Sequence, residues 1–311
     1  MNLDGAARDA LLALLRRLDE IGYHFVAPTP ATHAKILARP SMKKASDLRG
    51  ILGWSLPFDP GLISRDLLSL LERADALESV DGGLKSKLRV SSVAGRLFLH
   101  SAYPTESEDS VFLGPDTYRF VHLLERALPG IGPVSRLVDQ GTGAGVGGIV
   151  AAAMLPGTRI TLLDVNRFAL GLAAINAAHA GVDIELVEGG DLGAVHGEID
   201  CLIANPPYMM DDGARNYRDG GDMHGAQLSF DWTIDAARRL RPGGAMILYT
   251  GSAIVDGCDE LHEALERSLP TLGCTLDYRE EDPDVFGEDL EKPAYADVER
   301  IAIVSAVVRR A

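Results

Sequence analysis

The expected fold of this chain of 311 residues follows first from the stretch Leu137-Val138-Asp139-Gln140-Gly141-Thr142-Gly143-Ala144-Gly145. Its apolar start predicts a buried strand, and the Ala- and Val-rich segment that follows predicts a helix. The glycines between them allow positive φ angles and a close approach of a ligand to the backbone. Exposed amide groups at the start of a helix favour an anionic group. The stretch therefore predicts a ligand-binding turn between a strand and a helix.

Strands and helices alternate on both sides of this turn. Repeated β–α units indicate a mostly parallel sheet that helices cover on both faces. We therefore expect an α/β fold, a doubly wound, mostly parallel, seven-stranded Rossmann-like sheet, within residues 112–311. The predicted strands are 136–139, 159–164, 184–187, 201–204, 245–249, 275–279 and 301–308.

The first 105 residues show a different pattern. Apolar residues at helical spacing predict helices at 6–21, at 31–38, through Leu52, and from Ser64 with a stripe that reaches Leu77. The apolar residues then alternate from Leu84 onward, about a turn at Ala94-Gly95, which predicts a β-hairpin. Helices followed by a basic hairpin resemble a winged-helix module. We expect a smaller N-terminal domain over 1–105 that recognises the substrate, followed by a polar linker.

The composition excludes several classes of protein. The longest nearly apolar run, 145–155, is too short to cross a bilayer, and no secretory signal is seen, so we expect no membrane partner. The cysteines Cys201, Cys258 and Cys274 are odd in number and widely spaced, which argues against a disulfide framework and fits a cytoplasmic protein. The eight histidines show no ligand spacing, so we expect no metal. The sequence does not predict an oligomeric state.

The charge is distributed unevenly. Residues 1–110 hold 14 basic and 14 acidic side chains, whereas residues 111–311 hold 16 basic and 31 acidic ones. Such an acidic half repels phosphate backbones and argues against nonspecific binding of nucleic acid. The neutral half nevertheless has basic clusters, which are either solvated faces or a surface for phosphates. They comprise Lys35, Arg39, Lys43, Lys44 and Arg49, and then Lys85, Lys87, Arg89 and Arg96.

Two carboxylates follow the next predicted strands. Asp164 ends the second strand, where a carboxylate can accept the two hydroxyl protons of a ribose. Asp191 follows the third strand, where it can accept from an adenine amine while Leu192 packs against the ring. Each acid has an ordinary structural explanation when taken alone. Together with the glycine-rich turn, they predict one crevice at the carboxyl ends of the strands.

The most specific motif is Asn205-Pro206-Pro207-Tyr208, at the end of the fourth predicted strand. Consecutive prolines fix the backbone and donate no N–H groups. The Asn205 side-chain oxygen and the Pro206 carbonyl can therefore accept the two hydrogens of one planar –NH2 group. Tyr208 can stack on that planar group. We interpret the motif as a site for a poorly nucleophilic amide or aromatic amine.

These motifs together resemble class I S-adenosylmethionine-dependent methyltransferases with the NPPY motif. Residues 112–311 are most similar to the HemK-like and methyltransferase small-domain groups, and 164–181 and Arg241-Pro242-Gly243-Gly244 also match. The resemblance implies a Rossmann-like methyltransferase fold, S-adenosyl-L-methionine as cofactor, and Asn205, Pro206, Pro207 and Tyr208 as the catalytic residues. The cofactor-binding residues implied are Asp139, Gly141, Thr142, Gly143, Gly145, Asp164, Asn166, Asp191, Leu192 and Asn205.

Several substrates remain open at this point. HemK-like proteins imply a protein glutamine side chain, which the acidic half also favours, but the segment 113–119 keeps only part of their PRPETE-like motif. The alternatives are an exocyclic amine of adenine or guanine in RNA or DNA, and a small molecule or peptide. A nicotinamide-dependent dehydrogenase fits Gly143, Gly145 and Gly148 but leaves Asn205–Tyr208 unexplained. The long loop 209–225 is a candidate lid.

Overall fold

The computed structural model describes residues 3–105, 107–210 and 218–311. Contacts between residues divide the chain into two compact units. Unit 1 contains Met1–Arg119, Gly143–Val146 and Arg167–Asp183, and unit 2 contains Phe120–Thr142, Gly147–Asn166 and Ile184–Ala311. The predicted domains, 1–105 and 112–311, were defined as continuous sequence ranges, and this division stays a prediction. No helix among the described residues is long and apolar enough to span a bilayer.

Unit 1 combines helices with two antiparallel hairpins. Asp4, Asp47 and Ser64 cap three of the helices by accepting hydrogen bonds from backbone N–H groups, as residues of these types do. Its elements are α1 (Gly5–Glu20), α2 (Pro30–Leu37), α3 (Leu48–Leu52), α4 (Arg65–Arg73), β1 (Leu77–Val80), β2 (Gly83–Ser86), β3 (Leu88–Val93), β4 (Arg96–Ser101) and α7 (Arg167–Ala180).

The predicted hairpin is confirmed in its second half and corrected in its first. β3 and β4 pair around Ala94 and Gly95, which both have positive φ angles, as a two-residue hairpin turn requires. Leu84, however, lies in a separate hairpin with β1. The helix predicted to reach Leu77 ends at Arg73, because Asp75 adopts a positive φ of 50° and breaks the helical path.

Most of the basic residues of the β2–β4 region already have protein partners. Lys87 forms an ion pair with Asp75 at 3.0 Å, and Lys85 donates to the Tyr103 carbonyl at 3.2 Å. Arg89 is only 3% exposed and donates to the Ser101 carbonyl. Burial lowers the pKa of Arg89 to about 10, partly offset by neighbouring tyrosines. This cluster is therefore a poor open surface for phosphates.

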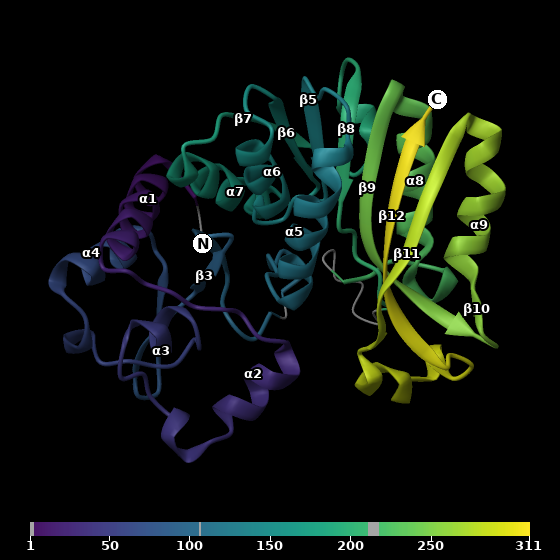
Figure 1. Cartoon of the computed structure of the whole chain (residues 1–311). Coiled ribbons are helices and arrows are strands. Elements are labelled where there is room, and N and C mark those ends of the chain that lie inside the picture. Colours follow the sequence, from purple (N-terminus) through teal and green to yellow (C-terminus); the bar gives the residue numbers. More distant parts are fainter. Residues whose placement is uncertain (1–2, 106, 211–217) are drawn as a thin grey trace. The chain divides into compact units, whose positions relative to one another are not determined.

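Unit 2 is built on the predicted doubly wound sheet (Figure 1). Within the described residues, its strands lie in the order β11-β12-β9-β8-β5-β6-β7, and short β10 pairs with β9. The pairs β8–β9, β5–β8, β5–β6 and β6–β7 are parallel, and only β12 runs against its neighbours on this path. The strands are β5 (Arg136–Gln140), β6 (Arg159–Asp164), β7 (Ile184–Glu188), β8 (Ile199–Ala204), β9 (Leu240–Val255), β10 (Cys258–Asp259), β11 (Cys274–Val285) and β12 (Arg300–Arg310).

Buried aliphatic residues explain why these segments form a central sheet. β8 is buried along its whole length, and β5 likewise, as expected for strands that are covered on both faces. Apolar side chains of the strands pack with those of the helices into one core cluster, including Leu202, Met246 and Leu265. The remaining helices are α5 (Pro115–Ala127), α6 (Val146–Met154), α8 (Gln227–Arg239) and α9 (Glu260–Ser268).

Candidate active site at the carboxyl ends of the strands

The strand order reverses at β5, which lies between β8 and β6. In open sheets of this kind, ligands bind outside the carboxyl ends of the strands at such a switch point. Because β7, β6, β5 and β8 are consecutive parallel neighbours, their carboxyl ends lie at one edge (Figure 1). Asp191, Asp164, Asp139 and Asn205 lie in or just after these ends. The topology thus brings the four predicted strand-end motifs to the same edge of the sheet.

The glycine-rich turn has the backbone that its sequence predicts. Gly141, Gly143 and Gly145 have φ angles of 68°, 53° and 81°, a region that residues with a Cβ rarely adopt. In unit 2, the N–H groups of Gly141 and Thr142 donate to the Leu163 carbonyl at 2.9 and 3.1 Å. A Cβ on Gly141 would lie 2.8 Å from the Trp232 ring, whereas one on Gly143 would meet nothing within 4 Å. Gly143 and Gly145 belong to unit 1.

Asp139 turns back onto the segment that follows it. Its Oδ2 atom accepts from the Thr142 hydroxyl at 2.7 Å and from the Gly148 N–H at 2.8 Å. Burial raises the pKa of Asp139 to about 7, although these two hydrogen bonds act in the opposite direction. Asp139 therefore stabilises the turn and the start of α6. Its predicted contact with a cofactor stays a prediction.

The neighbouring Gln140 is a candidate site residue that the sequence patterns did not indicate. Its Nε2 atom lies 3.5 Å from the Gly190 carbonyl, in the loop after β7. Its Oε1 atom is buried and has no hydrogen-bond partner in the described part of the chain. A buried acceptor without a donor is costly, and a ligand donor would satisfy it. Gln140 lies within the stretch 137–145, but the sequence pattern there does not distinguish it from an ordinary strand residue.

The two predicted acids after β6 and β7 both form local caps. Asp164 is half-buried and accepts from the Asn166 N–H at 2.9 Å. Asp191 is exposed and accepts from the Gly193 N–H at 2.7 Å. Oδ1 is the acceptor in both of these bonds, and a carboxylate can accept several more. Leu192 is 1% exposed and packs in the core, so its predicted contact with a ring stays a prediction.

Asn205 directly follows β8, and its carboxamide has no partner among the described residues. Its side chain is half-buried and forms no hydrogen bond with any described residue. The Pro206 carbonyl likewise accepts none within the described residues. Both groups are therefore acceptors that the described residues leave unused. This is the condition that recognition of a ligand –NH2 group requires.

Tyr208 is held against the neighbouring strand. A Cβ on Gly251 of β9 would lie 2.4 Å from the Tyr208 ring, so only glycine allows this packing. The Phe286 ring lies 6.1 Å from the Tyr208 ring, at 54°. Phe286 has a φ of 57°, a strained conformation for a bulky residue. No motif in the sequence points to Phe286, which lies in the acidic tract between β11 and β12.

The segment between β11 and β12 also holds the chain after Tyr208. Asp289 binds the Arg218 guanidinium through both carboxylate oxygens at 3.0 Å, and it also pairs with Lys292. The Tyr295 hydroxyl accepts from the Met210 N–H at 2.7 Å. His224 contacts the exposed Asp297 at 3.2 Å. The predicted lid 209–225 is thus anchored at both described ends, while its Arg215 and Tyr217 lie outside the described residues.

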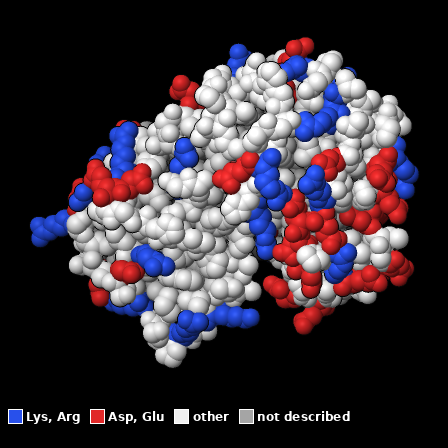
Figure 2. All heavy atoms as spheres, viewed as in Figure 1, with Lys and Arg blue, Asp and Glu red and all other residues white. Residues whose placement is uncertain are grey.

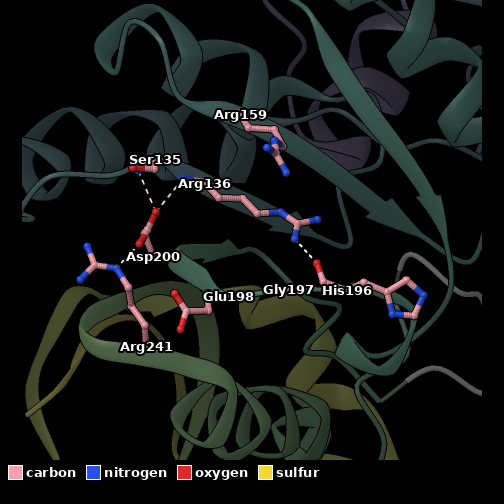
Figure 3. Close-up of a pocket in the computed structure, with 8 residues that line it drawn as sticks. All are labelled: Ser135, Arg136, Arg159, His196, Gly197, Glu198, Asp200 and Arg241. Carbon is pink, nitrogen blue, oxygen red and sulfur yellow. Dashed lines mark hydrogen bonds and ion pairs between the residues drawn. The ribbon is translucent and has the colours of Figure 1, made fainter.

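A separate polar pocket of about 450 Å³ lies at the amino ends of β5, β6 and β8, the opposite edge of the sheet (Figure 3). Asp200 accepts there from the backbone N–H groups of Ser135 and Arg136 and from the Arg241 guanidinium. Burial alone would raise the pKa of Asp200, but these hydrogen bonds outweigh it and hold the pKa below its usual value. The hydrogen bonds that line this pocket connect the amino end of β8 with those of its neighbouring strands, which is a structural role.

Comparison with known proteins gives consistent matches. Residues 120–254 match the family model described as methyltransferase small domain. The release factor glutamine methyltransferase of Deinococcus radiodurans is 31% identical over 162 residues, 52% of this chain and 56% of that protein. Ribosomal RNA small subunit methyltransferase C of Pseudomonas putida W619 is 28% identical over 222 residues, 71% of this chain and 57% of that protein.

Among solved structures, TrmN from Thermus thermophilus aligns over 92% of this chain and 81% of its own, with 22% identity and a TM-score of 0.44. The chain spans little more than half the length of the two curated relatives described above. The matched segment 120–254 runs from α5 through β9 and contains Asp139, Asp164, Asp191 and Asn205. Together with the sheet order and the motifs at the strand ends, this match makes residues 120–254 similar to the methyltransferase small domain family.

Proposed function

We propose that the protein is an S-adenosylmethionine-dependent N-methyltransferase that acts on a planar amide or amine nitrogen. The observation that carries the proposal is the Asn205-Pro206-Pro207-Tyr208 motif at the end of β8, with the Asn205 carboxamide and the Pro206 carbonyl unused by described residues. Two acceptors on a fixed backbone suit the two hydrogens of one –NH2 group. The family of residues 120–254 supports the same reaction class.

The residues at the strand ends fit S-adenosylmethionine. The cofactor has ribose hydroxyls and amino groups to donate, and this edge of the sheet supplies acceptors in Asp164, Asp191 and the orphaned Gln140 Oε1. The positive φ angles of Gly141, Gly143 and Gly145 and the open space beside Gly143 suit a backbone that contacts a ligand closely. When bound, the cofactor supplies an electrophilic methyl group.

The protein groups contribute positioning and electrostatics. Asn205 Oδ1 and the Pro206 carbonyl hold the target –NH2 and draw its lone pair out of conjugation, which makes the nitrogen a better nucleophile. The same oxygens stabilise the positive charge that develops on nitrogen. Holding the nitrogen in line can lower the barrier by up to about 7–11 kcal/mol in favourable cases. No general base is required, because the methylated nitrogen is acidic and loses its proton to water.

A protein glutamine side chain is the preferred substrate in this proposal. Figure 2 shows Asp and Glu gathered over the C-terminal part of unit 2, where residues 277–299 contain ten acidic and two basic side chains. This charge disfavours a phosphate backbone near the site. The partners of Lys85 and Lys87 and the burial of Arg89 also leave little of the basic hairpin cluster for phosphates.

An exocyclic amine of RNA is the second candidate. Similarity to a protein named ribosomal RNA small subunit methyltransferase C extends over 71% of this chain, further than the similarity to the glutamine methyltransferase. The two acceptors at Asn205 and Pro206 suit an adenine or guanine amine equally well.

Transfer of radiolabelled methyl groups separates the two candidates. The protein is incubated with labelled S-adenosylmethionine and a cell extract, which is then divided and treated with protease or with RNase. We expect label that protease releases and RNase does not, and we expect the Asn205→Ala variant to transfer far less. Label that only RNase releases would favour the RNA amine, and no transfer above the variant's level to any fraction would contradict the proposal.

A further inference from the structure

Asn176 of α7 joins two parts of unit 1 that are distant in sequence. Its side chain is 1% exposed, and all of its hydrogen-bonding groups are used. Oδ1 accepts from the Leu99 N–H at 2.9 Å, and Nδ2 donates to the Leu99 carbonyl at 3.1 Å and to the Ala144 carbonyl at 2.8 Å. One carboxamide therefore connects β4 with the middle of the glycine-rich turn.

The contact with Leu99 resembles strand pairing. Leu99 lies opposite Val90 in the two-stranded β3–β4 hairpin. The N–H and C=O groups of one strand residue point to the same side, so Leu99 presents both to the carboxamide as it would to a third strand. A small hairpin is only marginally stable alone, and the Asn176 side chain supplies a lateral partner for it. The order of β4 therefore depends on the position of Asn176.

The contact with Ala144 fixes the orientation of a peptide group in the turn. In a planar trans peptide, the C=O and the following N–H point in opposite directions. Because the Ala144 carbonyl points to Asn176, the Gly145 N–H points away from it. In a glycine-rich turn that leads into a helix, such an N–H group is a donor for an anionic ligand group. Asn176 thus sets the direction of a donor that a cofactor carboxylate can use.

We propose that Asn176 is a positioning residue that couples occupancy of the glycine-rich turn to the order of the β3–β4 hairpin, an inference that rests on the proposed cofactor site. A ligand bound to the turn fixes the 144–145 peptide group. The Ala144 carbonyl then fixes the Asn176 carboxamide, and the carboxamide fixes the backbone of Leu99. Coupling of this kind is reciprocal, so a loss of the Asn176 hydrogen bonds also weakens ligand binding at the turn.

Amide hydrogen exchange of the intact protein, with and without S-adenosylhomocysteine, tests this coupling. We expect the ligand to slow exchange of the Leu99 amide by about tenfold or more, within the usual range of coupling between sites. The amides of the β1–β2 hairpin are the internal control, since the side-chain hydrogen bonds of Asn176 go to Leu99 and Ala144 and not to this hairpin. They should exchange at the same rate in both states.

Two variants separate positioning from general packing. Asn176→Asp keeps an acceptor for the Leu99 N–H but loses both donors, so we expect about tenfold weaker S-adenosylhomocysteine binding and no ligand effect on Leu99. His179→Gln, on the same helix, changes the 2.9 Å contact of the His179 ring with Asp19 and leaves the turn contact intact. It should bind the ligand as the parent does.

The outcomes distinguish this inference from the proposed function. If the parent protein binds S-adenosylhomocysteine but exchange at Leu99 does not change, the coupling is wrong and the methyltransferase assignment stands. If the parent protein does not bind the ligand at all, the proposed cofactor site is wrong and the coupling falls with it. The exchange measurement on the parent protein is informative even if Asn176→Asp does not fold.

Discussion

Asp164 ends β6 and Asn205 follows β8, the two strands that flank β5, and the proposed function gives the two residues different roles. Asp164 provides acceptors for the cofactor, whereas Asn205 holds the target nitrogen. Asp164→Ala should weaken S-adenosylhomocysteine binding by about 1.5–3 kcal/mol, the contribution of hydrogen bonds to a charged acceptor. Asn205→Ala should leave this affinity nearly unchanged and lower kcat, because its interaction concerns the reacting group. Calorimetry and single-turnover rates measure the two effects.

The reverse result would contradict the assignment of the strand ends. A loss of cofactor affinity in Asn205→Ala, together with normal binding by Asp164→Ala, would place the cofactor beside β8 and away from β6.

Asp139 predicts a pH-dependent stability. An acid whose pKa rises from 3.8 to about 7 on folding takes up a proton, so its favourable contribution is present below about pH 4 and is lost as the pH rises through about 7. Asp139→Asn keeps an acceptor for Thr142 and Gly148 but carries no charge. The variant should therefore gain stability relative to the parent between pH 5 and pH 8, without cofactor. Urea unfolding of both proteins at these two pH values gives the difference.

If the stability difference between Asp139→Asn and the parent were the same at pH 5 and pH 8, Asp139 would titrate normally and the raised pKa would be wrong. The cause of the raised pKa, the burial of Asp139, is a property that the sequence alone did not predict. An aspartate at the end of a strand looks like a ligand-binding acid, but its burial under the turn depends on the packing of α6, which no local pattern encodes.

At the scale of elements, the connection between β11 and β12 supports the chain that follows Tyr208. Asp289 is 5% exposed and carries the bidentate contact with Arg218. Asp289→Asn leaves two cations without a full partner and should release the segment that Arg218 begins. Loss of a positioned segment beside a site can lower a rate by about 100-fold, so we expect kcat/KM to fall by at least tenfold with little change in cofactor affinity.

Asp297→Asn is the matched control, since Asp297 pairs with His224 while its own side chain is 65% exposed. Exposed pairs contribute little, about 0–1 kcal/mol. Equal kinetics for the Asp289 and Asp297 variants would show that the β11–β12 connection does not position the site.

The elements of the sheet were predicted well because their signals are local and repeated. The strand 159–164 was predicted with the bounds that β6 has, and the glycine-rich turn has the expected positive φ angles. The β1–β2 hairpin was missed because four-residue strands give no clear period, and Leu77 was assigned to a helix because its spacing continued the stripe of α4. The β1–β2 hairpin forms because Leu77–Val80 pairs with Gly83–Ser86. The sequence of one segment does not show which other segment it pairs with.

At the scale of the whole molecule, the charge distribution distinguishes the substrate classes. If RNA is the substrate, the logarithm of its affinity should fall steeply with the logarithm of salt concentration. The net charge of −15 and the paired basic residues of the β2–β4 region predict a shallow slope instead. The acidic composition alone predicts this weak salt dependence. The ion pair of Lys87 and the burial of Arg89, which support it, are visible only in the tertiary structure.

A parallel titration with S-adenosylhomocysteine and NADH shows which of the two the protein binds, and with it the nature of the cofactor. The GxGxxG spacing of Gly143, Gly145 and Gly148 suits either molecule, so the claim depends on the other strand ends. We predict micromolar binding of S-adenosylhomocysteine by the intact protein and no binding of NADH. Tight binding of NADH without S-adenosylhomocysteine binding would contradict the proposed cofactor and would identify the glycine-rich turn as a dinucleotide-binding turn.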